Sequence, residues 1–417
     1  MKKVLPLLLL VLAHGNAQFA SPVGASPQGA SNPQVSRAIE FIKQNEVETV
    51  NEQAKICEIP APSFKEQVRA AYLKQRFVEL GLKNVRIDAE GNVLGERPGE
   101  TAQPTLVLAA HLDTVFPEGT DVKVTRTGTT LKAPGIGDDT RGLAVLLAVI
   151  RAMNEANIST RGTIIFVANV GEEGLGDLRG TRYLFNKELK GKITHFVSVD
   201  GTGHGTTNRA VGSNRYRVTF RGPGGHSYGA FGMTNPIHAL GRAIEKISRF
   251  KVPSQPKTTF NVGRIAGGTS VNSIAYEAWM EMDMRSESPA ALATVDSSFK
   301  RAVQQALDEE NAFWTSPTKV TVEVKLVGER PTGEQPADAP IVRIAMAVDS
   351  SLGIRTRLNA SSTDSNIPIS LGIPAITIGG GGQGRGAHSP DESFDSTDSY
   401  IGTQRVLLII LGIVGIR

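Results

Sequence analysis

Four short apolar runs, each bounded by turn-forming residues, dominate the first and last parts of the chain. The runs cover 105–110, 163–170, 194–199 and 374–378. A strongly apolar helical pattern over 139–155 lies between the first two runs, and another helical segment precedes the last. Apolar strands that alternate with helices are typical of a mostly parallel sheet with helices on both faces. The pattern therefore predicts an α/β domain built on such a sheet.

Signals at the start of this domain predict helices and a hairpin. Residues 35–55 have a helical pattern. A second helix is predicted to open at Ser63, where Glu66 completes a capping box, and to stop at Gly81. Short strands flank Glu90-Gly91-Asn92, a sequence typical of a hairpin turn.

The stretch from about 213 to 328 has a different pattern. Strand and helix signals follow one another in the order βαββαβ, over 215–220, 236–249, 258–265, 274–284, 289–309 and 319–327. This order is the split βαβ arrangement of a small ferredoxin-like α+β domain. Signals of the first kind resume after Pro331, so this domain is predicted to be inserted. The main domain would then consist of 35–212 and 329–417, and its last helix, ending in Val406 to Ile416, is predicted to be buried.

The N-terminus has the features of a secretory signal peptide over residues 1–17. Lys2 and Lys3 precede an apolar stretch from Val4 to Ala13, and Ala17 ends a run of small residues. The apolar stretch is too short to span about 30 Å of hydrocarbon. We therefore expect cleavage near Ala17 and export to the periplasm or exterior of a bacterial cell. Residues 18–34 are rich in Ser, Pro, Gly, Ala and Gln and are predicted to be a disordered linker.

The charge pattern argues against a nucleic-acid-binding protein, and the cysteine content argues against a disulfide-stabilised one. The formal net charge of the chain is +4, and Lys and Arg are scattered without a basic run that would follow phosphates. Nucleic acid is therefore not an expected partner. The single cysteine, Cys57, excludes an internal disulfide, so stability must come from the core and from any bound metal.

The polar residues that could carry chemistry follow the predicted strands. They are His111 and Asp113 after the first run, Glu172 and Glu173 after the second, Asp200 after the third and His388 beyond the fourth, with Asp138 and Asp139 at the start of the 139–155 helix. The carboxyl ends of parallel strands meet at one edge of a sheet, where open α/β sheets place ligands. So many buried carboxylates would repel one another, and divalent cations would relieve the repulsion. Mixed imidazole and carboxylate ligands suit zinc.

Each of these residues also has an ordinary structural explanation when it is taken alone. A histidine at a strand end is often simply hydrogen-bonded, Asp138 or Asp139 would cap a helix, and Glu172-Glu173 or Asp200 would lie in a turn. The coincidence of all of them at strand and helix ends favours a metal site.

Several segments resemble the co-catalytic zinc metallopeptidase family that includes peptidase T, carboxypeptidase G, aminoacylase and succinyl-diaminopimelate desuccinylase. The matching segments are IPAPSFKE, AAHLDTV, GIGDDTRG, GEEG, SVDG, GPGGHSYG and GAHSPDE, in this order along the chain. One departure is Thr140-Arg141, where many relatives have Lys after the paired Asp, and we expect it to affect the surroundings of the metals more than their ligands. The resemblance implies an amide-bond hydrolase.

The resemblance also implies a role for each polar residue. Two zinc ions would be held by His111 and Asp200, by Glu173 and His388, and by Asp138 as the bridge between them. Cobalt or manganese would suit the same ligands. Asp113 would orient His111, and Glu172 would be the general base that takes a proton from the attacking water.

In the inserted domain, the resemblance assigns substrate-binding roles to His226, Asn272 and Arg285. His226 would reach the substrate carbonyl oxygen, from the partner subunit if the protein is a homodimer. Asn272 and Arg285 would bind a substrate carboxylate, to which Arg is suited by its permanent charge and paired donors. Residues 379–382 are all glycine and would let the main chain approach the substrate closely.

Alternatives remain at this point. The substrate is expected to be a small peptide cut by an exopeptidase, and an N-acyl amino acid cut by a deacylase fits the same metal centre. Residues 225–229 match G-x-S-x-G, which would make Ser227 the nucleophile of a serine hydrolase, but a loop follows instead of a helix. A binding module without activity would be expected to lack the base or some ligands, and none of them is missing.

Overall fold

The structure, a computed structural model, describes residues 32–417. The predicted signal peptide lies outside these residues, and so does the predicted linker up to residue 31. The rest of the predicted linker is not a linker, because helix α2 (Pro33–Gln44) begins there and the Asn32 side chain accepts hydrogen bonds from two of its first N–H groups. The predicted 35–55 helix is two helices, α2 and α3 (Glu46–Cys57), which meet at Asn45.

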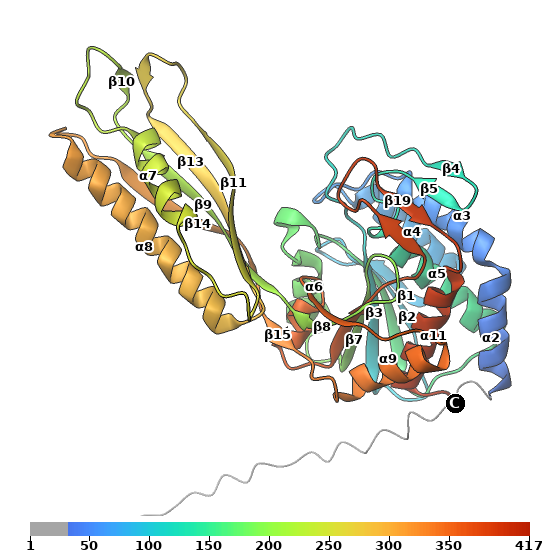
Figure 1. Cartoon of the computed structure of the whole chain (residues 1–417). Helices are drawn as coiled ribbons and strands as arrows, with labels where there is room; N and C mark the ends of the chain where they lie inside the picture. The colour runs from blue at the N-terminus through green and yellow to red at the C-terminus, as the bar shows by residue number, and fades with distance from the viewer. Residues whose placement is uncertain (1–31) are drawn as a thin grey trace, which may run out of the picture.

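A nine-stranded sheet forms the main domain (Figure 1). Its four central strands pair in parallel in the order β6-β3-β7-β17. They are β3 (Thr105–His111), β6 (Thr163–Asn169), β7 (His195–Val199) and β17 (Ala375–Ile378), which are the four predicted apolar runs. Nearly every side chain on them is buried, as expected for strands covered on both faces. The predicted fold class is confirmed.

The edges of this sheet are less regular. On one side, β1 (Lys83–Ile87) and β2 (Val93–Arg97) form the predicted antiparallel hairpin, whose turn is held by Asp88. On the other side lie three strands that the sequence pattern did not indicate. They are β8 (Thr206–Ala210), β15 (Gly333–Glu334) and β16 (Leu358–Ser361).

Helices cover both faces of the sheet. The main core packs α5 (Thr140–Glu155) and α11 (Tyr400–Val414) against the central strands, with α2, α4 (Gln67–Glu79) and α9 (Pro340–Ser351) around them. The opposite face is covered by α6 (Arg179–Tyr183), η2 (Leu184–Glu188) and α10 (Asn366–Ser370). As predicted, α11 is buried. No helix within residues 32–417 is long and apolar enough to cross a membrane.

A second, antiparallel sheet forms the inserted domain, which extends away from the main domain (Figure 1). Its strand order is β11-β13-β9-β14, as in a split βαβ fold. The elements are β9 (Gly212–Arg221), α7 (Pro236–Ser248), β11 (Thr258–Gly267), β13 (Glu277–Ser286), α8 (Pro289–Phe313) and β14 (Thr321–Arg330). Both helices pack on one face and share an apolar core with the sheet.

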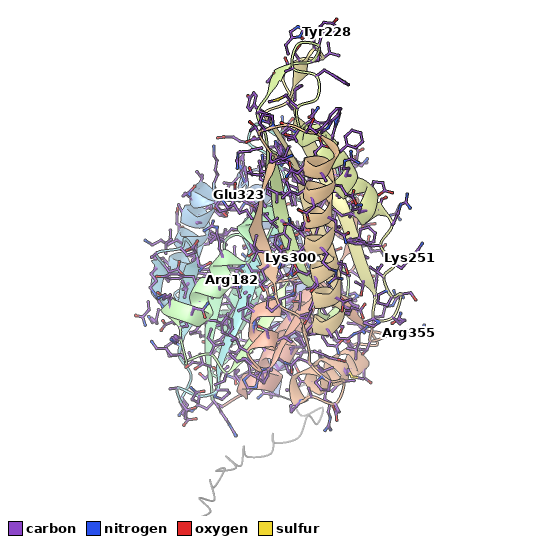
Figure 2. All side chains as sticks on the ribbon, turned by 90° about the vertical axis from the view of Figure 1, so that its left-hand side faces the viewer. Arg182, Tyr228, Lys251, Lys300, Glu323 and Arg355 are labelled. Carbon is purple, nitrogen blue, oxygen red and sulfur yellow. The ribbon has the colours of Figure 1, made fainter. Side chains whose placement is uncertain are left out.

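The far end of the inserted domain carries a two-stranded ribbon, β10 (Gly225–His226) with β12 (Ser273–Ile274), and the loop that follows β10. We call residues 225–234 and 268–274 the tip. Figure 2 shows Tyr228 of this tip at the end of the molecule farthest from the main domain.

A third, small sheet joins segments that are distant in sequence. Its order is β18-β19-β5-β4, and all its pairs are antiparallel. The strands are β4 (Thr125–Thr127), β5 (Thr130–Lys132), β18 (Gln383–Arg385) and β19 (Ser393–Asp395). This sheet places residues 383–395 beside the loop that leads from β5 into α5.

Candidate metal centre

The five predicted metal ligands meet at the carboxyl ends of the central strands. Asp138 lies in the middle of them, because its two carboxylate oxygens face two imidazoles. Oδ1 is 2.9 Å from Nε2 of His111, and Oδ2 is 3.1 Å from Nε2 of His388. His388 Nε2 also lies 3.0 Å from Oε1 of Glu173. The peptide bond between Asp138 and Asp139 is cis.

Two overlapping groups of ligand atoms result, each with its atoms within 4.8 Å of one another. One group is His111, Asp138 and Asp200, and the other is Asp138, Glu173 and His388. Ligand atoms around one tetrahedral zinc lie on the order of 3.3 Å apart, given metal–ligand distances of about 2.0–2.2 Å. The donor types and spacing therefore fit two zinc ions that share Asp138. A third group, His111 with Glu172 and Glu173, overlaps the same place.

Charges in this cluster are poorly balanced without a cation. Burial, and then the charge of Asp138, raise the pKa of Asp200 to about 7. Hydrogen bonds to Asp138 and Glu173 raise the pKa of His388 to about 10. Burial opposes ionisation of Asp138, but hydrogen bonds to the two imidazoles hold its pKa below the usual range. A divalent cation bound here would compensate the carboxylates and compete with protons for the same groups.

Asp113 organises the loop between β3 and the ligands. The backbone carbonyl of Asp113 lies 3.0 Å from Nδ1 of His111, which leaves Nε2 facing the centre. Its fully buried carboxylate accepts the backbone N–H groups of Glu172 (3.0 Å) and Glu173 (2.9 Å). Asp113 thus contacts the predicted base and two ligands without pointing into the centre itself.

Ser63 also contacts Asp113, and this corrects the predicted capping box. Helix α4 begins at Gln67, and its N-cap residue, Glu66, makes no side-chain cap bond. The Ser63 hydroxyl instead donates to Asp113 Oδ2 at 2.7 Å, and Glu66 pairs with Arg179 at 2.7 Å. The residues that match a helix start therefore stabilise the site and its surrounding loops, where buried charged partners offer stronger hydrogen bonds than a helix end does.

Glu172, the predicted base, is buried beside the centre and paired with Arg330. Arg330 Nη1 lies 2.9 Å from Glu172 Oε1, and Nη2 donates to the backbone carbonyl of Glu172. Burial raises the pKa of Glu172 well above its usual range, and the charge of Arg330 offsets only part of this effect. Arg330 was not among the predicted site residues, because an arginine at the end of a strand of the inserted domain has no local signal that links it to a distant glutamate.

The three predicted substrate-binding residues of the inserted domain are not brought together. Arg285 lies near the main domain, paired with Asp283 at 2.8 Å. Asp283 also pairs with Arg215, whose Nη1 donates to the carbonyl of Gly174, just after Glu173. His226 and Asn272 lie exposed at the tip. Strand β13 separates the two places by on the order of 30 Å. Within one chain, Asn272 and Arg285 cannot bind the same carboxylate.

Ser227 has no catalytic surroundings. It lies in a turn of the tip, and within residues 32–417 no hydrogen bond joins its hydroxyl to a histidine. The one hydrogen bond described for it is the backbone N–H donating to the carbonyl of Asn272. The geometry gives no support to the serine hydrolase alternative.

The glycines at 379–382 make room for the protein's own main chain. A Cβ atom on Gly379 would lie 2.4 Å from the carbonyl oxygen of Thr202, and one on Gly381 would lie 2.5 Å from that of Ser399. Arg141, the departure from the family pattern, is fully buried and donates to the carbonyls of Gly380 (2.8 Å) and Ser399 (2.7 Å). Close approach to neighbouring loops thus accounts for Gly379 and Gly381 without a substrate, and the expected approach of this main chain to the substrate stays a prediction.

Comparisons with known proteins agree with this site. The sequence profile of Peptidase family M20/M25/M40 matches residues 107–411. Protein YqjE of Bacillus subtilis is 26% identical over 352 residues, which is 80% of this chain and 90% of that protein. Acetylornithine deacetylase of Yersinia pestis is 26% identical over 318 residues, or 72% and 77% of the two chains.

A solved structure of similar sequence is that of a tripeptidase from Staphylococcus aureus. It is 25% identical, with a TM-score of 0.72, and the match covers 88% of this chain and 98% of the tripeptidase. The similarity therefore extends over both the main and the inserted domain.

Proposed function

This chain belongs to Peptidase family M20/M25/M40 and is a hydrolase of peptide or linear amide bonds, and on that premise we propose that it is a zinc-dependent exopeptidase of small peptides. The observation that carries the proposal is the pair of ligand groups that share Asp138. Two metal ions at such a spacing would activate a water molecule and polarise the carbonyl of the scissile bond. Zinc is proposed because the ligands are two imidazoles and three carboxylates.

Glu172 is proposed as the general base and Asp113 as the residue that holds it in place. A base must lie within hydrogen-bond reach of the proton that it accepts, and Glu172 belongs to one of the three groups of ligand atoms. Its backbone N–H is fixed by Asp113 and its carboxylate by Arg330. In this role Glu172 takes a proton from the attacking water and passes it to the leaving nitrogen.

Two features favour a peptide substrate. The tripeptidase of Staphylococcus aureus matches nearly the whole described chain. Arg285 is partly exposed and shares Asp283 with Arg215, which donates to the carbonyl of Gly174 after Glu173, and its permanent charge would suit the free carboxylate of a short peptide. Deacylation of an N-acyl amino acid is the second candidate, favoured by the similarity to acetylornithine deacetylase.

We further propose that the protein is a homodimer in which the tip of one chain reaches the metal centre of the other. His226 and Asn272 lie too far from their own chain's centre to contact a substrate there. A fully active monomer in analytical ultracentrifugation would rule this out.

The first experiment measures bound metal and hydrolysis together. The purified chain is analysed for zinc and assayed on dipeptides, tripeptides and N-acyl amino acids, before and after chelation. We expect about two zinc ions per chain and peptide hydrolysis that is lost to the chelator and restored by zinc. Hydrolysis of N-acyl amino acids alone would select the deacylase, and activity without any bound metal would refute the proposal.

A further inference from the structure

Glu392 is a buried carboxylate to which the function described so far gives no role. It lies in the same segment as His388 and is 2% exposed. Its Oε1 accepts the backbone N–H groups of Gly137 (2.8 Å) and Asp138 (3.0 Å), and its Oε2 accepts that of Gly135 (2.9 Å). Glu392 therefore holds the main chain of Asp138, whose side chain faces both imidazoles of the centre.

The main chain around Glu392 is tied to the same loop. Strand β19 begins at the next residue and pairs with β5, with Ser393 opposite Lys132. The backbone N–H of Ala133 donates to the carbonyl of Glu392 at 3.2 Å. The backbone of Glu392 thus continues the hydrogen bonding between β19 and β5, and its side chain binds the residues that follow β5, up to Asp138. Glu392 therefore links the two segments that carry His388 and Asp138.

The groups around the Glu392 carboxylate are hydrogen-bond donors, so the position favours a side chain that only accepts. Within residues 32–417, Glu392 forms no ion pair with lysine or arginine, so backbone N–H groups alone compensate its burial. A Cβ atom at position 137 would lie 3.1 Å from its Oε1 and 3.2 Å from Cγ2 of Thr202. Gly137 therefore lets the loop lie against the carboxylate. A glutamine at this position would place its NH2 group, which is a donor, against backbone N–H groups, which are donors too.

We propose that Glu392 is a positioning residue of the metal centre, which sets the position of Asp138 relative to His388. This inference rests on the proposed metal-dependent function. Because Asp138 belongs to both groups of ligand atoms, a shift of its loop changes the geometry offered to both ions. Residues outside the ligand shell that orient ligands typically affect metal affinity or activity by about 10–100-fold.

The test compares Glu392→Gln with a matched control, Glu310→Gln. Glu310 is also a fully buried carboxylate that accepts a backbone N–H, that of Asn235 at 2.9 Å, but it lies in the inserted domain and, unlike Glu392, also pairs with an arginine, Arg242, at 3.2 Å. Zinc dissociation constants are measured for the wild-type chain and both variants by competition with a chromophoric chelator. The rise in Tm on adding zinc is recorded for each, together with kcat and KM.

We expect Glu392→Gln to bind zinc about 10–100-fold more weakly than the wild-type chain, to gain less in Tm on adding zinc, and to lose kcat more than KM. Glu310→Gln should lower Tm without changing zinc affinity. Equal zinc affinity and kcat in Glu392→Gln and wild type would overturn the inference. A wild-type chain that binds no stoichiometric zinc would instead refute the proposed function.

Glu392→Asp keeps the test valid if the glutamine variant does not fold. The shorter side chain retains the charge but withdraws the carboxylate from the loop. Weaker zinc binding than wild type would support the inference, and wild-type affinity would overturn it.

Discussion

The metal centre and the tip of the inserted domain differ in how their residues are brought together. At the centre, His111 ends one of three strands that lie side by side, and Glu173 and Asp200 follow the other two, so the topology of the sheet gathers them. At the tip, His226 and Asn272 lie on or beside a ribbon that, among residues 32–417, pairs with no strand of the main sheet. A parallel sheet gathers its strand ends within one chain, whereas an extended loop acts only on whatever it reaches, which here would be a second chain.

The largest expected effect lies at the centre. Glu172→Gln should lower kcat by about 10²–10⁴-fold, because it removes the proton acceptor, while the zinc content stays that of the wild type. Elemental analysis and steady-state kinetics on the best peptide check this. The control is Glu310→Gln, which changes a buried carboxylate far from the centre. Retained activity in Glu172→Gln would assign the base to another residue.

His226→Ala should also lower kcat, by about 10²-fold if the imidazole stabilises the developing charge on the carbonyl oxygen. A complementation experiment tests whether the imidazole acts on the partner's centre. Co-expression of His226→Ala with Glu172→Gln, each with its own affinity tag, produces heterodimers. One of their two centres then has both an intact base and an intact tip from the partner. The mixture should regain about a quarter of wild-type activity. If the tip acts within its own chain, no activity returns.

A smaller effect is expected where the two domains meet, at the pair between Arg330 and Glu172. Arg330→Ala removes the buried hydrogen bonds that Arg330 donates to the carboxyl group and to the backbone carbonyl of Glu172, which should lower the free energy of unfolding by about 1–3 kcal/mol. Urea denaturation of the metal-free chain measures this. Arg330→Lys should recover part of the loss, because it retains the charge but not the paired donors. An unchanged unfolding free energy in Arg330→Ala would mean that the pair is dispensable.

The mildest test changes pH rather than sequence. In the metal-free chain, the raised pKa of His388, about 10, gives stability that is complete below its usual pKa of about 6.5 and is lost as pH rises through 10. The raised pKa of Asp200, about 7, makes its ionisation costly as pH rises from about 4 through 7. Both groups therefore destabilise the metal-free chain as pH rises.

Zinc should reverse that trend, because it replaces the protons on both groups. Thermal melts at pH 6, 8 and 10, with and without zinc, should show a rise in Tm on adding zinc that grows with pH. Calorimetric titrations at pH 7 in buffers of different ionisation enthalpy should show proton release on binding. Binding without proton release would contradict the pKa shifts of these two residues.

The sequence predicted what depends on strand order and missed what depends on contacts between distant loops. The buried strands and the residues that follow them were identified because apolar runs and turn residues are local signals. The small sheet of β4, β5, β18 and β19 was not, because its strands are three residues long and its central pair, β5 with β19, joins two distant parts of the chain. Strands of three residues are too short to show the alternation of apolar and polar residues by which a strand is recognised.

Individual side chains show the same limit. Ser63 matched a helix cap, and only the fold shows that Asp113 is its partner. Arg330 and Glu392 each bind a segment more than 150 residues away, at separations of 158 and 254 residues. From one sequence, nothing distinguishes them from an ordinary surface arginine and a turn glutamate.

The contact between His388 and Asp138 joins residues that are 250 positions apart. A refolding chain therefore has no complete ligand set until the segment that carries His388 has joined the loop that carries Asp138. Proteins rich in contacts of such long range fold more slowly than proteins with local contacts. Zinc uptake would then report that these two segments have met, and a stopped-flow zinc indicator would follow that step in real time.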